Sequence, residues 1–136
     1  MDPSTKIAIV VANDLQVWQK LNVVAFLTSG IISQVNGIIG EQYVDGTGKT
    51  YSPLCMQPVV ILNSNKERLA TYLERANRRG AIAAIYIEDM FETGHDEANR
   101  QTVLKYRTQE LPLVGIGIRA DKKEVDKIFK GAKLHA

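Results

Sequence analysis

Four short apolar runs, each closed by polar or turn-forming residues, divide the chain. They cover residues 6–12, 58–62, 81–87 and 113–118, and runs of this length predict buried strands. The longest segment between them, residues 17–35, has apolar residues on most sides of a helical wheel. We therefore predict an internal helix whose main stripe consists of Val17, Leu21, Val24, Ile31 and Val35.

Capping patterns mark two more helices. Ser64 and Glu67 have the spacing of a capping box and predict a helix that runs to Gly80, and Asp121 and Glu124 repeat the spacing before a last helix that runs to Gly131. The polar residues 88–106 predict one or two short helices, split at Gly94. Residues 45–48 read Asp-Gly-Thr-Gly, which predicts the turn of a surface hairpin.

The order of these elements is typical of an α/β protein. Apolar strands joined by helices predict a mostly parallel sheet in a three-layer α/β/α sandwich, with the hairpin as a small insertion, and one domain over residues 1–136. Ligands of such folds bind beyond the carboxyl ends of the strands. That rule points to residues 13–14, 63–64, 88–89 and 119–121.

Charge, cysteine content and the length of the apolar runs argue against several classes of protein. The chain has 17 Lys+Arg, 15 Asp+Glu and one cysteine, Cys55, which argues against a histone-like protein, a polybasic membrane binder and a disulfide framework. The first residues, Met1-Asp2-Pro3, do not resemble a secretory signal, and the longest apolar run in residues 15–40 is far too short to cross a membrane. We expect a cytoplasmic protein that does not bind membranes.

Lys20 is the only charged residue between positions 15 and 40. A cation near the first turn of a helix is unfavourable, so one interpretation is that Lys20 binds a substrate anion together with helix amides. The other is a surface lysine paired with Asp14 or with an acid from another loop.

Acidic residues crowd positions 88–97, with His95 among them. His95 or Asp89 could act as a general acid or base, and the alternative is a solvated acidic loop that faces Arg78, Arg79 or Arg100. The single Glu-x-x-His spacing at Glu92 lacks the partners that a metal site needs, so we expect no metal and no cofactor. Trp18 could stack on a base, but a lone aromatic residue at the start of a helix is usually an anchor into the core. Alternate glycines at 115 and 117 would let a helix pack closely on a strand.

Three blocks of the chain resemble an uncharacterised bacterial family known as domain of unknown function two thousand. They are Asp14–Val23 with Ala25-Phe26-Leu27 and Ser29-Gly30; Tyr86-Ile87-Glu88, Met90-Phe91, Thr93–Asp96 and Asn99-Arg100; and Arg119-Ala120-Asp121, Val125-Asp126-Lys127 and Lys130–Ala136. The resemblance implies a fold similar to peptidyl-tRNA hydrolase type II, which is a mixed four-stranded sheet with helices on both faces, and a homodimer. It implies no activity.

The hydrolase likeness can be followed to single residues. Lys20 resembles the lysine that follows the hydrolase's Asp-Leu, one position late, and Asp89 and Thr93 match the outer residues of its Asp-Ala-Gly-x-Thr motif. Met90-Phe91 replaces Ala-Gly, and Trp18-Gln19 stands where the hydrolase has a glycine-rich run. These departures fall on the residues that would act on tRNA.

Two functions from different classes follow. The first is a hydrolase-like enzyme that acts on an ester or amide of an anionic substrate, in a polar cleft at the strand ends. The second is a non-catalytic homodimeric module that binds a ligand or a protein in the same cleft. The expected catalytic residues are Lys20, Asp89 and His95, and the expected binding residues are Asp14, Asn22, Thr93, Asp96 and Arg100.

Overall fold

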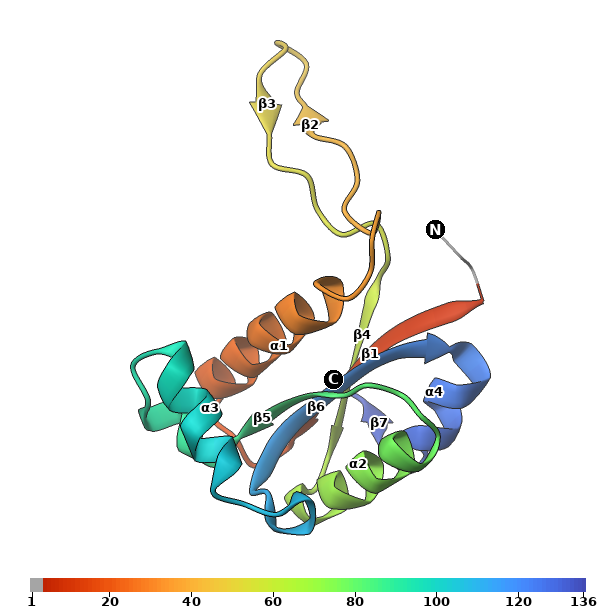
Figure 1. Cartoon of the computed structure of the whole chain (residues 1–136). Helices are drawn as coiled ribbons and strands as arrows, with labels where there is room; N and C mark the ends of the chain where they lie inside the picture. The colour runs from red at the N-terminus through yellow and green to blue at the C-terminus, as the bar shows by residue number, and fades with distance from the viewer. Residues whose placement is uncertain (1–3) are drawn as a thin grey trace.

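The computed structural model describes residues 4–136 and shows one mixed sheet with helices on both faces and a hairpin that projects from it (Figure 1). Residues 1–3, on which the expectation about a secretory signal rests and with which the expected domain begins, lie outside the described residues.

The sheet has five strands in the order β5-β6-β1-β4-β7. The central strand β1 (Thr5–Ala12) is parallel to β4 (Val59–Ser64) on one side and antiparallel to β6 (Leu113–Asp121) on the other. The outer strands β5 (Ala84–Ile87) and β7 (Lys133–Leu134) are antiparallel to β6 and β4. Residues 7–12 of β1 are fully buried, as expected of an apolar strand covered on both faces.

The expectation of a mostly parallel sheet of four strands is wrong in both respects. Among the described residues the sheet has five strands, and one of its four pairings is parallel. The short helices after β5 do not carry the chain back across the sheet. Instead, the amide of Glu88 donates to the carbonyl of Pro112 at 2.9 Å, so β6 starts at the edge where β5 ends and must run in the opposite direction.

The antiparallel direction of β6 changes which residues meet at the edge of the sheet where ligands were expected to bind. Strands β1, β4 and β5 all end at one edge, which brings residues 13–14, 63–64 and 88–89 to the same side as predicted. Residues 119–121 do not join them, because Arg119 and Asp121 pair with Ile7 and Thr5 at the opposite end of β1.

Helix α1 (Val17–Ile32) covers one face of the sheet with Val23, Leu27 and Ile31. The two glycines of β6 make this contact possible: a Cβ on Gly115 would overlap the Val23 side chain, and one on Gly117 would lie 2.8 Å from Cδ1 of Ile31. The predicted role of these glycines is confirmed. The predicted stripe is confirmed for Ile31, which is buried, and for Val24 and Val35, which pack against the core, but it is wrong for Val17 and Leu21, which are exposed. The helix ends at Ile32 rather than at residue 35.

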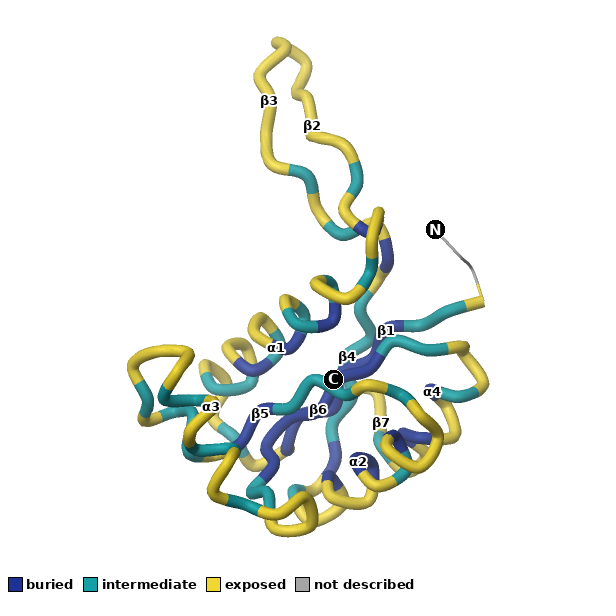
Figure 2. Tube along the Cα trace, viewed as in Figure 1, coloured by how far each residue is buried: buried dark blue, intermediate teal, exposed yellow. Residues whose placement is uncertain are grey.

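Helices α2 (Leu69–Arg78) and α4 (Lys122–Ile128) cover the other face (Figures 1 and 2). A 3₁₀ turn (Lys66–Arg68) precedes α2, and its cap is Asn65, whose side chain accepts from the Arg68 amide at 3.1 Å. The hydroxyl of Ser64 instead lies 3.0 Å from that of Tyr72. The last helix stops short of Gly131, whose φ of 105° turns the chain into β7.

The remaining elements lie outside these layers. As predicted, the segment after β5 splits at Gly94, into a 3₁₀ turn (Glu88–Glu92) and helix α3 (Asp96–Leu104); a second 3₁₀ turn (Thr108–Glu110) leads to β6. The predicted hairpin is formed by β2 (Tyr43–Val44) and β3 (Thr50–Tyr51), which are exposed along their length (Figure 2).

Candidate functional site

One side of α1 carries a stripe of three residues that lies apart from its buried face. Trp18, Asn22 and Phe26 follow each other at intervals of four residues, which places them on one side of a helix. Trp18 and Phe26 are 53% and 57% exposed. The expectation that Trp18 anchors the helix in the core is therefore wrong.

The segment after β5 faces this stripe. Its shape follows from local signals: Gly94 interrupts the helical residues, and His95 caps α3 by accepting from the Ala98 amide through Nδ1 at 3.2 Å. Asp96 and Glu97 occupy the first turn of α3, where acidic side chains favour the helix dipole. Asp96 also forms an ion pair with Arg100, one turn further on.

A pocket of about 450 Å³ lies between the stripe and this segment. Four of the predicted site residues line it: Asn22, Thr93, His95 and Asp96. The lining also includes Trp18, Phe26, Tyr86, Met90, Phe91, Gly94 and Asn99. Its lining residues come from α1, from Tyr86 of β5, from residues 90–95 and from α3; Figure 1 shows these elements next to one another.

Four aromatic rings form a continuous wall in this pocket. Trp18 meets Phe91 edge-on with ring centroids 5.9 Å apart, Phe91 lies 5.1 Å from Tyr86, and Tyr86 lies 5.9 Å from Phe26. These distances are those of favourable ring pairs. The wall joins α1 to the strand end of β5 and offers apolar area to a bound molecule.

Tyr86 brings a polar group to the wall. The residue is 7% exposed, and its hydroxyl makes no hydrogen bond to another described residue. Every fully buried side-chain nitrogen or oxygen in the described residues has a hydrogen-bond partner, so the Tyr86 hydroxyl, which has none among them, is not fully buried. Burial raises the pKa of Tyr86 above its ordinary value of 10, so the hydroxyl keeps its proton at neutral pH.

The polar rim is partly fixed by internal bonds. The Thr93 hydroxyl lies 3.1 Å from the Met90 carbonyl and contacts Oδ1 of Asn99. Because Nδ1 of His95 accepts an amide proton, the neutral His95 ring carries its own proton on Nε2. The rim therefore offers an N–H donor at Nε2 of His95 and a carboxylate at Asp96.

The other predicted residues lie outside this pocket. Lys20 is two positions from Trp18, about 200° around the helix, and its Nζ is 3.2 Å from Nε2 of His135. Both oxygens of Asp89 accept from the Tyr106 hydroxyl, at 3.1 and 2.9 Å. Asp14 is exposed, and Arg100 reaches the pocket only through its ion pair with Asp96.

Sequence reasoning missed the aromatic wall. Tyr86 and Phe91 stand in an apolar strand and in the turn after it, which is typical of core residues, and Phe26 interrupts a polar line of α1. The four-residue spacing of Trp18, Asn22 and Phe26 could have indicated this wall, because it places the three side chains on one side of the helix, apart from its buried side.

Other sites of chemistry are less well supported. A larger hollow of about 680 Å³ lies between α2 and the turn before β6, but it is lined mainly by the exposed side of α2 and holds none of the predicted residues. Within residues 4–136 no group of three His, Cys, Asp or Glu side chains is arranged to hold a metal ion. In the same residues, no helix combines the length and the apolar character needed to cross a membrane.

Comparisons with known proteins agree with the sequence resemblance. The family model described as protein of unknown function DUF2000 matches residues 5–136. A solved structure of the protein of unknown function Atu0240 from Agrobacterium tumefaciens strain C58 is 51% identical, with a TM-score of 0.95 over 98% of each chain. No curated protein matches the chain.

Proposed function

The chain belongs to the DUF2000 family of proteins of unknown function, and we propose that it is a binding module for a small, uncharged or cationic organic molecule, held in the pocket between α1 and residues 86–99. The observation that carries this proposal is Tyr86, which lines an aromatic pocket and whose hydroxyl has no hydrogen-bond partner among the described residues. A group in this position gains a partner from a bound molecule or from water.

The lining defines the chemistry of the ligand. The four rings favour a flat or apolar part that can stack on them, at about 0.5–1.5 kcal/mol for each well-placed aromatic pair. The Tyr86 hydroxyl and Nε2 of His95 both donate, so the ligand needs an acceptor such as a carbonyl oxygen. This is the usual composition of small-molecule sites, which are mainly apolar with a few directed polar groups.

Charge disfavours an anion. The charged side chain in the pocket lining, apart from the titratable His95, is the carboxylate of Asp96, and Glu92 and Glu97 lie within a few residues of it. Lys20, the cation that the sequence suggested for an anionic substrate, lies on the other side of α1. Asp96 is largely exposed and paired with Arg100, so its repulsion of an anion is modest. Because no Lys or Arg lines the pocket to hold an anion, a neutral or cationic ligand fits better.

The hydrolase-like alternative has less support. A general base must be free to take a proton from water, but Nε2 of His95 carries a proton as long as Nδ1 caps α3. Both oxygens of Asp89 are occupied by the Tyr106 hydroxyl, and Lys20 contacts His135. Each of the three expected catalytic groups is thus engaged with a different partner, which favours binding over ester or amide hydrolysis.

The fluorescence of Trp18 provides the test, because Trp18 is the single tryptophan of the chain and lines the pocket. We expect benzamide, which has a ring and a neutral acceptor, to change this fluorescence saturably with a Kd on the order of millimolar, as for other fragments of its size. Benzylamine should bind comparably and benzoate more weakly. No saturable change and no rise in Tm with either benzamide or benzylamine would reject the proposal.

Two variants test whether benzamide binds in the pocket lined by Tyr86. Tyr86→Phe removes the hydroxyl and keeps the ring, so it should weaken benzamide binding about fivefold to tenfold, as expected for a lost hydrogen bond of about 1 kcal/mol. Tyr43→Phe, on the distant hairpin, should leave the affinity unchanged. Hydrolysis of p-nitrophenyl acetate that disappears in His95→Gln would instead favour the enzyme.

A further inference from the structure

The four aromatic rings of the pocket are inclined to one another and do not form a flat stack. From Trp18 through Phe91 and Tyr86 to Phe26, successive ring planes are inclined by 71°, 48° and 44°. Trp18 and Phe26 lie on the same side of α1, and the residues between them separate their Cα atoms by about 12 Å. Phe91 and Tyr86 connect the two, and all four rings line the same pocket. The pocket is therefore bordered by rings of several orientations.

This arrangement suits an organic cation. The face of an aromatic ring attracts a cation that lies within about 6 Å of the ring centroid. A group halfway between Trp18 and Phe26 is about 6 Å from each, because the two residues are about 12 Å apart along the helix. Both side chains are more than half exposed, so part of each ring is free to make such a contact. Several rings around one site are the usual means of recognising a quaternary ammonium group.

The cations of the chain itself do not occupy these rings. Within residues 4–136, the contacts between a cationic side chain and a ring join Lys49 to Tyr51 on the hairpin and Arg75 to Tyr72 on α2. Neither contact involves a ring of the pocket. The four rings therefore remain available to a cation that comes from outside.

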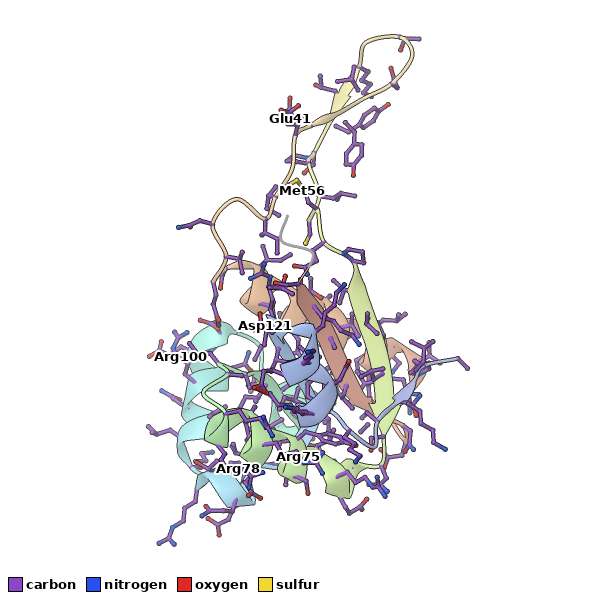
Figure 3. The ribbon with its side chains drawn as sticks, turned by 90° about the vertical axis from the view of Figure 1, so that its right-hand side faces the viewer. Glu41, Met56, Arg75, Arg78, Arg100 and Asp121 are labelled. Atoms are coloured by element: carbon purple, nitrogen blue, oxygen red, sulfur yellow. The ribbon has the colours of Figure 1, made fainter. Side chains whose placement is uncertain are left out.

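The chain around the pocket carries negative charge. Residues 86–99 contain five acidic residues and neither Lys nor Arg. The acidic residues in the first turn of α3 offset the positive end of its dipole. Arg100 pairs with Asp96, but Figure 3 shows Arg100 at the surface, and an ion pair as exposed as this one contributes little. Arg75 and Arg78, labelled in the same figure, belong to α2 on the other face of the sheet.

The polar groups of the lining favour a methylated ammonium over a primary one. A primary ammonium has three N–H donors that need acceptors. Most acceptors in the lining are engaged: Oδ1 of Asn99 contacts the Thr93 hydroxyl, and the Asp96 carboxylate pairs with Arg100. The amide oxygen of Asn22 could satisfy one donor. A trimethylammonium group has no N–H donor, so it enters the pocket without leaving a polar group unpaired.

We propose that the ligand of this pocket is a small compound that carries a trimethylammonium group, held between Trp18 and Phe26, and an oxygen atom close to that group. The oxygen accepts from the Tyr86 hydroxyl or from Nε2 of His95, the two donors described above. The volume of about 450 Å³ is that of an ordinary small-molecule pocket. The inference rests on the proposed function, because it names the class of ligand for the same pocket.

Choline and two relatives of choline test the trimethylammonium group. Neohexyl alcohol has the shape of choline with a carbon atom in place of the nitrogen, and ethanolamine has the charge without the methyl groups. We expect choline to change the Trp18 fluorescence saturably with a Kd on the order of millimolar. Choline should bind at least about fivefold more tightly than either relative. Its advantage over neohexyl alcohol should persist in about 0.5 M NaCl, because contacts inside a pocket are screened little by salt.

The variant Phe26→Leu tests the contribution of the rings. It removes an aromatic face and keeps an exposed apolar side chain, so it should weaken choline binding about threefold or more. The affinity for neohexyl alcohol should stay the same, which also shows that the pocket is intact. Tyr43→Leu makes a matched change on the hairpin and should alter neither affinity.

The outcomes separate this inference from the proposed function. Saturable binding of benzamide with equal affinities for choline and neohexyl alcohol would overturn the trimethylammonium class and leave the binding module supported. No binding of benzamide, benzylamine or choline would overturn both. Loss of the choline advantage in salt would show that the acidic segment attracts any cation, and equal weakening of both compounds in Phe26→Leu would show a purely apolar contact. Either result would also overturn the inference.

Discussion

Lys20 and His135, 115 positions apart in the sequence, meet with Nζ 3.2 Å from Nε2. A lysine ammonium can only donate, so Nε2 of His135 accepts and its Nδ1 carries the proton, 2.9 Å from the carbonyl oxygen of Ala136. The His135 amide in turn donates to the Ile61 carbonyl at 3.0 Å. The charge that stood out in the sequence thus ties α1 to the segment that follows β7.

Replacing Lys20 should loosen this segment. We expect Lys20→Met to lower the free energy of unfolding by about 1 kcal/mol, because it removes a partly buried hydrogen bond but keeps the aliphatic stem. Hydrogen exchange at the His135 amide should become faster. Urea denaturation and exchange measured by NMR check both effects, with Lys105→Met at an exposed position as the control. Equal stability and protection in the two variants would mean that the contact contributes nothing.

Gly115 should be intolerant of any side chain. Gly115→Ala places a Cβ against Val23 and 3.2 Å from Cδ1 of Leu27, and the backbone of β6 cannot retreat because it is paired on both sides. We expect a loss of about 1–3 kcal/mol, the usual cost of overpacking a core. Gly46→Ala is the control, since an added Cβ there has no neighbour within 4 Å. Similar melting temperatures for the two variants would show that α1 can shift.

The strands could be predicted because each is an apolar run with polar ends, whereas the direction of β6 could not. An apolar run looks the same whichever way the strand points. The direction is decided by the close approach of Glu88 and Pro112, which no pattern in residues 88–112 announces. β7 has two residues, too few to show any periodicity.

The buried side of α1 was ambiguous for a similar reason. When a helix is apolar on most sides, its pattern does not select a stripe, and the glycines of β6 select Val23, Leu27 and Ile31 by leaving room for them. Thr93, His95 and Asp96 could be expected among the residues that line the candidate pocket because they follow the end of β5. The place of Tyr86 in the pocket could not be predicted, because an aromatic residue in an apolar strand is typical of the core and no sequence pattern shows that its ring also lines a pocket.

The tip of the hairpin formed by β2 and β3 should respond to acid through Asp45. Its carboxylate accepts from the Thr47 hydroxyl, the Tyr51 hydroxyl and the amides of Lys49 and Thr47, which together lower the pKa of Asp45 from 3.8 to about 2. The stabilisation is complete above the ordinary value of 3.8 and is lost as the pH falls through about 2. NMR should show the Thr47 and Lys49 amides shifting with a midpoint near pH 2. In Asp45→Asn this transition should vanish; a midpoint near 4 in the wild type would contradict these contacts.

Tyr106 should report on the segment that builds the pocket. Its hydrogen bond to Asp89, with smaller contributions from burial and from the charges of Asp89 and Glu88, raises the pKa of Tyr106 above 10. The bond therefore holds residues 88–92 to the end of α3 at neutral pH and is lost as the pH rises through the raised value. In Asp89→Leu, the absorbance titration of tyrosinate near 295 nm should show one tyrosine moving toward pH 10. In Tyr106→Phe that titration step should be missing. The variant should also bind benzamide more weakly, as measured by Trp18 fluorescence, because the turn that carries Phe91 loses the hydrogen bond between Asp89 and Tyr106. Glu97→Leu, at an exposed position of α3, is the control. An Asp89→Leu titration curve identical to the wild-type curve would show that Asp89 does not hold Tyr106 in solution.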